Sequence, residues 1–293
     1  MNRNGIILFL VAALFGFTSY AQNKETNPKQ AQVIMYKQVD TVKLNLTIFH
    51  PENYQKDKEY PAILFFFGGG WVSGSIGQFE PSARYFASRG MIAILADYRI
   101  FNKHKTTPFD ALKDARSAMR YLRANARALS INPNKIAAAG GSAGGHLAAA
   151  LDLTQIAEAS ENSNVNTRPN ALVLYNPVYD NGPNGYGYER IGERYPEISP
   201  LHNIKKGAAP TIVFFGTKDK WVPVATAQMY KQKMEEVGSR CDLFLYLDQP
   251  HGFFNFNRKD GQRYYLETLK ESDVFLESLG FIKGKPKVDI FKF

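Results

Sequence analysis

Apolar residues occur along this chain in short continuous runs, separated by longer stretches in which they recur with helical spacing. The short runs predict strands at residues 33–39, 42–49, 62–67, 91–96, 135–139, 171–175, 211–215 and 243–247. The amphipathic stretches predict helices at residues 79–88, 109–129, 142–155, 224–237 and 263–279. Strands that alternate with helices predict an α/β fold, a mainly parallel sheet of these eight strands with helices on both faces. The first two strands are expected to pair antiparallel.

Two stretches between the predicted elements lack such periodicity. Residues 158–170 are polar and predict a surface loop. Residues 176–203 are rich in Tyr, Gly and Pro and lie where a short cap could be inserted. Because no internal repeat and no interdomain linker is visible, we expect residues 22–293 to form a single catalytic domain.

The first 21 residues are typical of a cleaved signal peptide. Arg3 precedes an apolar core at residues 5–15, and Ser19 and Ala21 are the small residues that a signal peptidase reads. An uncleaved anchor is the alternative, since the uncharged stretch 4–22 is just long enough to span a bilayer. We expect cleavage, export to the periplasm or the medium, and no stable membrane insertion of the processed protein.

A glycine-flanked serine carries the strongest chemical signal. Gly140-Gly141-Ser142-Ala143-Gly144 follows one predicted strand and opens a predicted helix. In this G-x-S-x-G pattern the glycines permit a strained turn that exposes the serine hydroxyl, and the helix N-terminus faces developing negative charge. Ser142 is therefore the candidate nucleophile.

A serine hydroxyl needs a base and an acid that orients the base, and both are expected on loops after later strands. Asp219 follows the strand at 211–215, and His251 follows the strand at 243–247. Asp248 is the competing acid, but it lies only three residues from His251, too close to reach Nδ1 of the ring. We predict His251 as the general base and Asp219 as its orienting acid.

A tetrahedral intermediate also requires preorganised N–H donors for its oxyanion. The amide of Ala143 is one candidate, because it directly follows the nucleophile. The others are the amides of Gly69 and Gly70 in the glycine run 68–70, where the absence of side chains lets the backbone approach a substrate.

Composition limits the remaining chemistry. The net charge is +9, but the positive residues are scattered, so nucleic acid is not a predicted partner. Cys241 is the only cysteine, which excludes an internal disulfide and a cysteine-based metal cluster. The other histidines lack metal-binding spacing, and His146, one turn after Ser142, is expected to support the site by hydrogen bonding. We expect no metal and no cofactor; no feature specifies an oligomeric state.

Taken together and in order, these motifs resemble the hormone-sensitive-lipase-like branch of the α/β-hydrolases. The resemblance covers about residues 42–279 and rests on Phe-Gly-Gly-Gly-Trp (67–71), Asp-Tyr-Arg (97–99), Gly-Gly-Ser-Ala-Gly-Gly-His-Leu (140–147), Gly-Thr-Lys-Asp (216–219), Trp-Val-Pro (221–223) and Pro-His-Gly-Phe (250–253). It implies the α/β-hydrolase fold and a serine carboxylic ester hydrolase. The family's usual histidine before the glycine run is replaced here by Phe67, which puts the geometry of that loop in question.

Small bacterial members of this branch include carbohydrate esterases such as acetyl xylan and feruloyl esterases. Export and the aromatic insertion suggest a small-molecule or polysaccharide ester, with Trp71, Tyr186 and Tyr188 as candidate substrate contacts and Tyr179 and Tyr195 nearby. A generalist short-chain carboxylesterase or lipase is the alternative. A non-catalytic ligand-binding homologue and a peptidase are further alternatives, although the full triad opposes the first and no additional domain supports the second.

Overall fold

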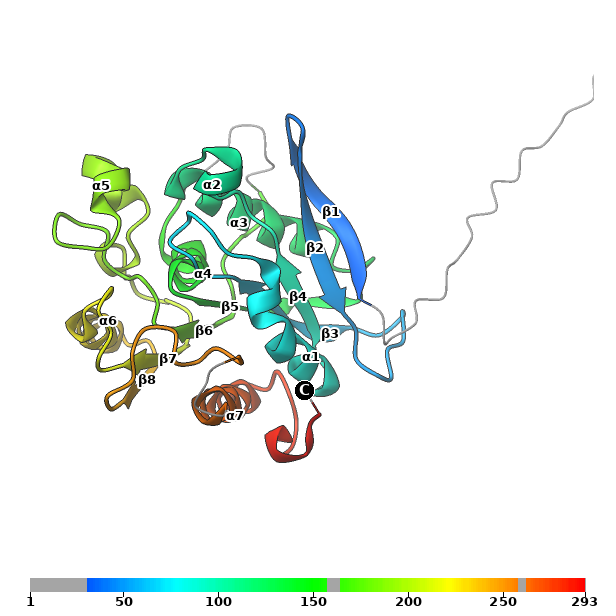
Figure 1. The fold of residues 1–293 in the computed structure, drawn as a ribbon. Coiled ribbons are helices and arrows are strands. Elements are labelled where there is room, and N and C mark those ends of the chain that lie inside the picture. Colours follow the sequence, from blue (N-terminus) through cyan, green and yellow to red (C-terminus); the bar gives the residue numbers. More distant parts are fainter. Residues whose placement is uncertain (1–30, 157–163, 258–261, 293) are drawn as a thin grey trace, which may run out of the picture.

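The computed structural model describes residues 31–156, 164–257 and 262–292. The predicted signal peptide lies outside the described residues, as does part of the predicted loop 158–170. In the described part of the chain, eight strands form one sheet in the order β1-β2-β4-β3-β5-β6-β7-β8 (Figure 1). Their bounds are β1 Gln32–Val39, β2 Val42–Phe49, β3 Tyr60–Phe66, β4 Ile92–Ala96, β5 Ile131–Gly141, β6 Ala171–Tyr175, β7 Thr211–Gly216 and β8 Cys241–Tyr246.

The predicted α/β-hydrolase architecture is confirmed. β1 and β2 pair antiparallel, β2 joins β4 antiparallel, and every later pairing is parallel. Because the strands from β3 to β8 run the same way, their carboxyl ends meet at one edge of the sheet, where an open α/β sheet places its ligand site.

Helices cover both faces of the sheet. They are α1 Glu80–Ser88, α2 Phe101–His104, α3 Pro108–Ala124, α4 Ala143–Leu153, α5 Tyr188–Ile191, α6 Val224–Glu236 and α7 Arg263–Ser278. Alternate strand residues divide between two cores, as expected of strands buried on both sides. One core contains Leu64 and Phe66 with α3, α4 and α6, and the other contains Ile63 and Phe65 with α1 and α7.

The observed helices differ from the predicted ones in two places. The helix predicted to reach residue 129 ends at Ala124, because the amide and side chain of Asn125 both donate to the carbonyl of Tyr121 and turns follow. Residues 101–104, for which no element was predicted, form the single turn α2, which ends where Lys105 adopts a left-handed conformation. One helical turn is too short to produce a periodic pattern in sequence.

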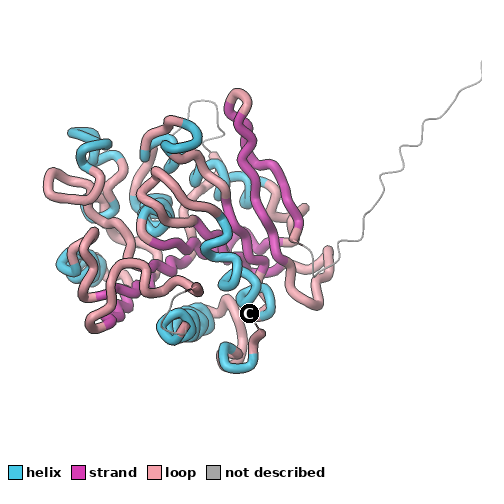
Figure 2. The backbone as a smooth tube through the Cα atoms, viewed as in Figure 1, coloured by secondary structure: helices cyan, strands magenta, loops and turns pink. Residues whose placement is uncertain are grey.

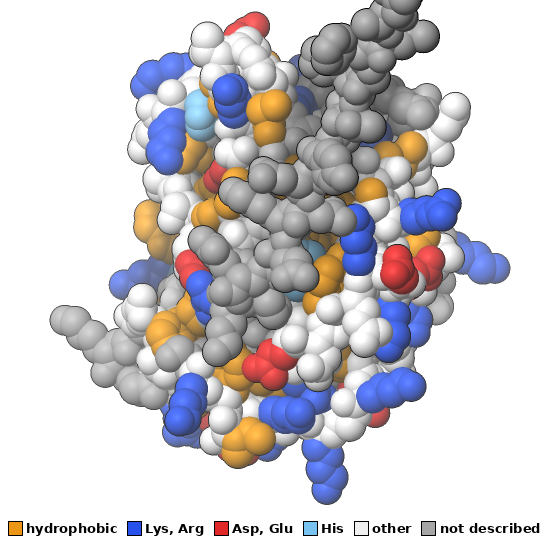
Figure 3. All heavy atoms as spheres, turned by 90° about the vertical axis from the view of Figure 1, so that its right-hand side faces the viewer, with side chains coloured by type: hydrophobic (Ala, Val, Ile, Leu, Met, Phe, Trp, Pro, Cys, Tyr) orange, Lys and Arg blue, Asp and Glu red, His pale blue; other side chains and the backbone are white. Residues whose placement is uncertain are grey.

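Two further properties of the structure are the distribution of its positive charges and the length of its apolar helices. On the face drawn in Figure 3, Lys and Arg side chains are spread over the surface and do not gather into one patch. Within the residues described, no helix is long and apolar enough to cross a bilayer.

Candidate active site

Ser142 lies at the sharp turn between β5 and α4. Its backbone has φ 54° and ψ −120°, a region that residues with side chains rarely adopt and that marks a strained functional turn. The flanking glycines are a steric requirement. A Cβ on Gly140 would lie 2.4 Å from the carbonyl oxygen of Gly144, and one on Gly144 would lie 2.1 Å from that of Phe66.

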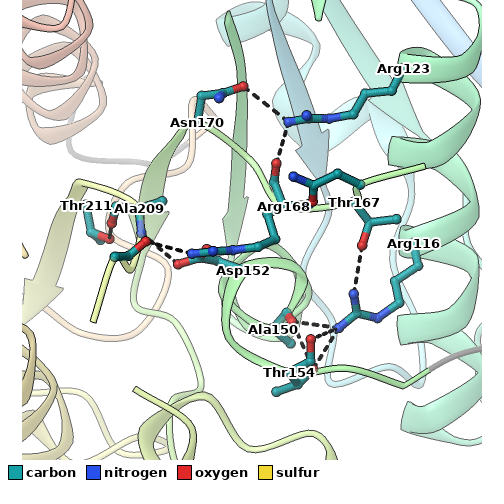
Figure 4. Close-up of polar contacts among 12 residues, drawn as sticks. Arg116, Arg123, Ala150, Asp152, Thr154, Thr167, Arg168, Asn170, Ala209 and Thr211 are labelled. Carbon is teal, nitrogen blue, oxygen red and sulfur yellow. Dashed lines mark hydrogen bonds and ion pairs between the residues drawn. The ribbon is translucent and has the colours of Figure 1, made fainter. Parts of the chain in front are cut away.

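The far end of α4 is fastened to the core by polar contacts (Figure 4). Arg116 donates from Nη2 to the carbonyl of Ala150 at 3.0 Å and to Thr154 Oγ1 at 2.9 Å. Asp152 accepts from Arg168 Nε at 2.9 Å and from the amide of Ala209 at 2.8 Å. Every residue of α4 is buried. A cation at the C-terminus of a helix is favourable, and these contacts hold the helix so that its N-terminus stays at Ser142.

His251 and Asp219 are joined by a hydrogen bond of 2.6 Å between Nδ1 and Oδ2. The other carboxylate oxygen of Asp219 accepts from the amides of Trp221 and Val222, and Asn176 Nδ2 donates to Oδ2. Burial of the Asp219 side chain opposes ionisation, but the contact with His251 and the two amides outweigh it and lower the pKa of Asp219 below its usual value. Asp219 is thus held as an anion beside the imidazole.

Asp248, the competing acid, does not contact His251. Its side chain is 61% exposed and forms an ion pair with Lys218 at 2.9 Å. The geometry therefore pairs His251 with Asp219.

A cleft of about 230 Å³ contains Ser142 and His251 together. Its other lining residues are Gly68, Gly69, Gly70, Ser73, Gln78, Tyr186, Trp221, Gly252, Phe254 and Asn255. The serine, the imidazole and the glycine run, which come from loops after β5, β8 and β3, thus share one solvent-accessible space.

The candidate oxyanion donors lie beside the serine. Gly69 and Gly70 have φ values of 122° and 64°, and a Cβ on Gly69 would lie 2.2 Å from the carbonyl oxygen of Ser73. Within the described residues their amides donate to no protein acceptor. Ala143 is the first residue of α4, where a helical amide has no acceptor inside the helix. The amides of Gly69 and Gly70 are thus unused by the described part of the protein, and that of Ala143 is unused by its own helix.

The loop that carries Phe67 is supported without the family's histidine. The Phe67 ring stacks on Tyr98 with 4.1 Å between centroids, and Tyr98 Oη donates to the carbonyl of Phe67 at 2.7 Å. Arg99 next to it pairs with the buried Asp114. Tyr98 therefore braces this loop.

Gln78 and Asn255 are among the cleft residues that the sequence did not single out. Gln78 Oε1 accepts from the amide of Gly68 at 2.6 Å, and Gln78 Nε2 donates to Asn255 Oδ1 at 2.8 Å. Asn255 Nδ2 in turn donates to the carbonyl of Gly252. This chain of bonds ties the glycine run to the loop of His251. In sequence, Gln78 and Asn255 are uncharged polar residues that follow the motifs at 67–71 and 250–253. No spacing rule distinguishes such residues from ordinary surface residues.

Among the candidate substrate contacts only Tyr186 lines the cleft. Trp71 does not line the cleft, because its side chain is 1% exposed and packs edge-on against His146. Tyr188 is outside the cleft and donates its hydroxyl to Glu193. The insertion 176–203 consists of loops and short helical turns (Figure 2).

His146 is fully buried, and its Nε2 donates to the carbonyl of Ile198 in the insertion at 3.0 Å. Burial lowers the pKa of His146 to about 4, against an ordinary value of 6.5. Among the described residues, no group of three or more His, Cys, Asp or Glu is placed to hold a metal ion.

Comparisons with known proteins identify the family of this chain. The BD-FAE family model matches residues 46–181. The solved structure of Thermogutta terrifontis esterase 2 phosphoramylated by tabun is 42% identical, covers 87% of this chain and 97% of its own, and superposes with a TM-score of 0.84. The sheet order and the turn at Ser142 are those of an α/β-hydrolase. The chain belongs to the esterase family of that fold.

More distant relatives are also esterases. Esterase LipC of Mycobacterium tuberculosis is 30% identical over 70% of this chain and 55% of its own length. An acetylxylan esterase of Xylanibacter ruminicola is 26% identical over 73% of this chain and 44% of its own length. The chain spans about half the length of these curated relatives.

Replacing Gln78 should loosen the glycine run without removing a reacting group. For Gln78→Ala we expect kcat to fall about 10- to 100-fold with little change in KM, because small displacements of positioned groups cost rate. Steady-state kinetics on p-nitrophenyl acetate measure this. Gln232→Ala, at an exposed glutamine on α6, is the matched control. A raised KM with unchanged kcat would mean that Gln78 binds substrate instead.

The buried His146 should make stability depend on pH. At pH 7.5 and above it is almost entirely neutral in both states; as the pH falls toward 5, the unfolded chain takes up a proton that the folded chain does not. Between pH 7.5 and 5 this costs about 2 kcal/mol of unfolding free energy. Urea titrations should show a shallower decrease for His146→Gln. The same decrease in both proteins would contradict the assignment.

Proposed function

We propose that the protein is a serine carboxylesterase that works through Ser142, His251 and Asp219. The observation that carries this proposal is the shared cleft, in which Ser142 on its strained turn accompanies an imidazole already hydrogen-bonded to a buried carboxylate. Membership of an esterase family supports it independently.

The mechanism follows from the contacts. Because Asp219 binds Nδ1 of His251, Nε2 is left to take the proton of Ser142 as its oxygen attacks the ester carbonyl. The amides of Gly69, Gly70 and Ala143 stabilise the oxyanion. The C–O bond to the alcohol breaks, His251 passes the proton to that oxygen, and water then hydrolyses the acyl-enzyme by the same route. This sequence needs no cofactor.

For the substrate we favour an acylated carbohydrate, with an acetyl or feruloyl group. The acetylxylan esterase relative and the position of Tyr186 in the cleft support this choice. A generalist short-chain carboxylesterase is the second candidate, favoured by the propionate-bound and butyrate-bound structures of the Thermogutta esterase, which are each 40% identical to this chain.

Substitutions of the proposed triad test the catalytic proposal. Ser142→Ala should lower kcat at least about 10⁴-fold and abolish labelling by a fluorophosphonate, because the covalent route is lost. Asp219→Asn should cost about 10³- to 10⁴-fold by permitting the wrong histidine tautomer. Asp248→Asn, with its exposed carboxylate, is the control and should cost little. Full activity of Ser142→Ala would refute the assignment.

Two acetates with similar alcohols separate the substrate candidates. A carbohydrate esterase should hydrolyse an acetylated methyl xyloside with kcat/KM at least about tenfold above that for the monoacetate of propane-1,2-diol, since only the sugar presents a ring for stacking. The diol keeps a hydroxyl next to the ester, so the leaving groups are alike. Equal values of kcat/KM would favour the generalist.

A further inference from the structure

Trp221 is the most unusual side chain at the cleft. It is 65% exposed, whereas the chain's other tryptophan, Trp71, is 1% exposed. Large aromatic surfaces usually find a partner, and an exposed aromatic residue at a cleft commonly marks a binding surface. Trp221 lines the same space as Ser142 and His251.

The backbone of Trp221 is fixed relative to the catalytic groups. Its amide donates to Asp219 Oδ1 at 2.8 Å, and the next residue, the buried Val222, donates to the same oxygen at 3.0 Å. The indole therefore projects from a point anchored to the acid that holds His251. These bonds use only main-chain N–H groups, so changing the side chain leaves them in place.

Tyr186 stands at a right angle to this indole. The two rings have centroids 6.5 Å apart and an interplanar angle of 85°. Tyr186 is itself held, because the Arg190 guanidinium lies 5.5 Å from its ring and donates to the carbonyl of Gly70. The carbonyl of Tyr186 accepts from Asn181 Nδ2. Two loops far apart in sequence thus form an aromatic corner, defined here as Trp221 and Tyr186.

The chemistry of acylation identifies which part of the substrate reaches this corner. As the C–O bond breaks, His251 must deliver its proton to the leaving oxygen, so the alcohol portion lies on the side of His251. Trp221 lines the cleft together with His251 and follows the acid bonded to that histidine, which favours this side for the corner. The cleft also presents polar side chains, those of Ser73, Gln78 and Asn255.

We propose that the aromatic corner is the subsite for the alcohol portion of the ester and that its occupant is a sugar ring. This inference rests on the proposed esterase function. A pyranose is apolar on its C–H faces and polar at its rim, which matches two aromatic walls beside hydrogen-bonding side chains. The carbonyl oxygen of the ester lies toward the glycine run, and the acyl group makes no contact with Trp221.

The test is a ratio of kcat/KM for two acetates, an acetylated methyl xyloside and the monoacetate of propane-1,2-diol, measured on each protein. Trp221→Ala should lower this ratio about 5- to 150-fold, the range expected for one lost stacking contact by analogy with nucleic-acid bases. Trp221→Phe should recover part of it, since a flat ring remains. Leu247→Ala, at a 78% exposed residue outside the cleft, should leave the ratio unchanged.

The ratio cancels differences in folding and in active-enzyme concentration. Equal losses on both acetates would show that Trp221 shapes the catalytic groups, and no loss on either would show that the indole does not touch substrate; each result overturns the subsite. If the wild type hydrolyses neither acetate nor p-nitrophenyl acetate, the esterase function itself fails, and the subsite with it.

Discussion

The turn at Ser142 requires a backbone conformation that residues with side chains ordinarily avoid, and the surrounding structure has to hold it there. Glycines at 140 and 144 remove the side chains that would collide with neighbouring carbonyls. The contacts of Arg116 and Asp152 at the opposite end of α4 prevent the helix from relaxing away from the strand. Strain of this kind persists only where packing over-determines the backbone, and α4 is buried along its whole length.

Parallel strands then bring the other groups to the same place. The glycine run follows β3, Asp219 follows β7 and His251 follows β8, so each loop begins at the same edge of the sheet. Loops anchored only at their strand ends would still move relative to one another. Gln78 limits that movement, because it bonds the loop after β3 to the loop after β8 across the cleft.

The fold and the triad candidates could be predicted from the sequence because their signals are local. Each of these signals, an apolar run followed by a glycine-flanked serine or by Asp219, lies within about ten consecutive residues and can be recognised there. The aromatic insertion shows the limit. Tyr179, Tyr186, Tyr188 and Tyr195 look equivalent in sequence, yet Tyr179 stacks on Tyr230 in the core, Tyr188 and Tyr195 pack near each other, and Tyr186 alone faces the cleft. Their separation depends on long-range packing, as does the bond between Gln78 and Asn255.

The contact between Asn176 and Asp219 marks where the core ends and the insertion begins. Asn176 donates its main-chain amide to the carbonyl of Phe214 and its side-chain amide to Asp219. The exposed turn at residues 193–197 can therefore change in length with little direct effect on the acid, since extending a surface loop adds only slowly to its closure entropy. The rest of the insertion is not independent of the hydrolytic centre, because Arg190 bonds the carbonyl of Gly70 and His146 bonds that of Ile198. A new substrate wall in place of Tyr186 would therefore have to evolve together with these contacts, with Asn176 as the fixed boundary.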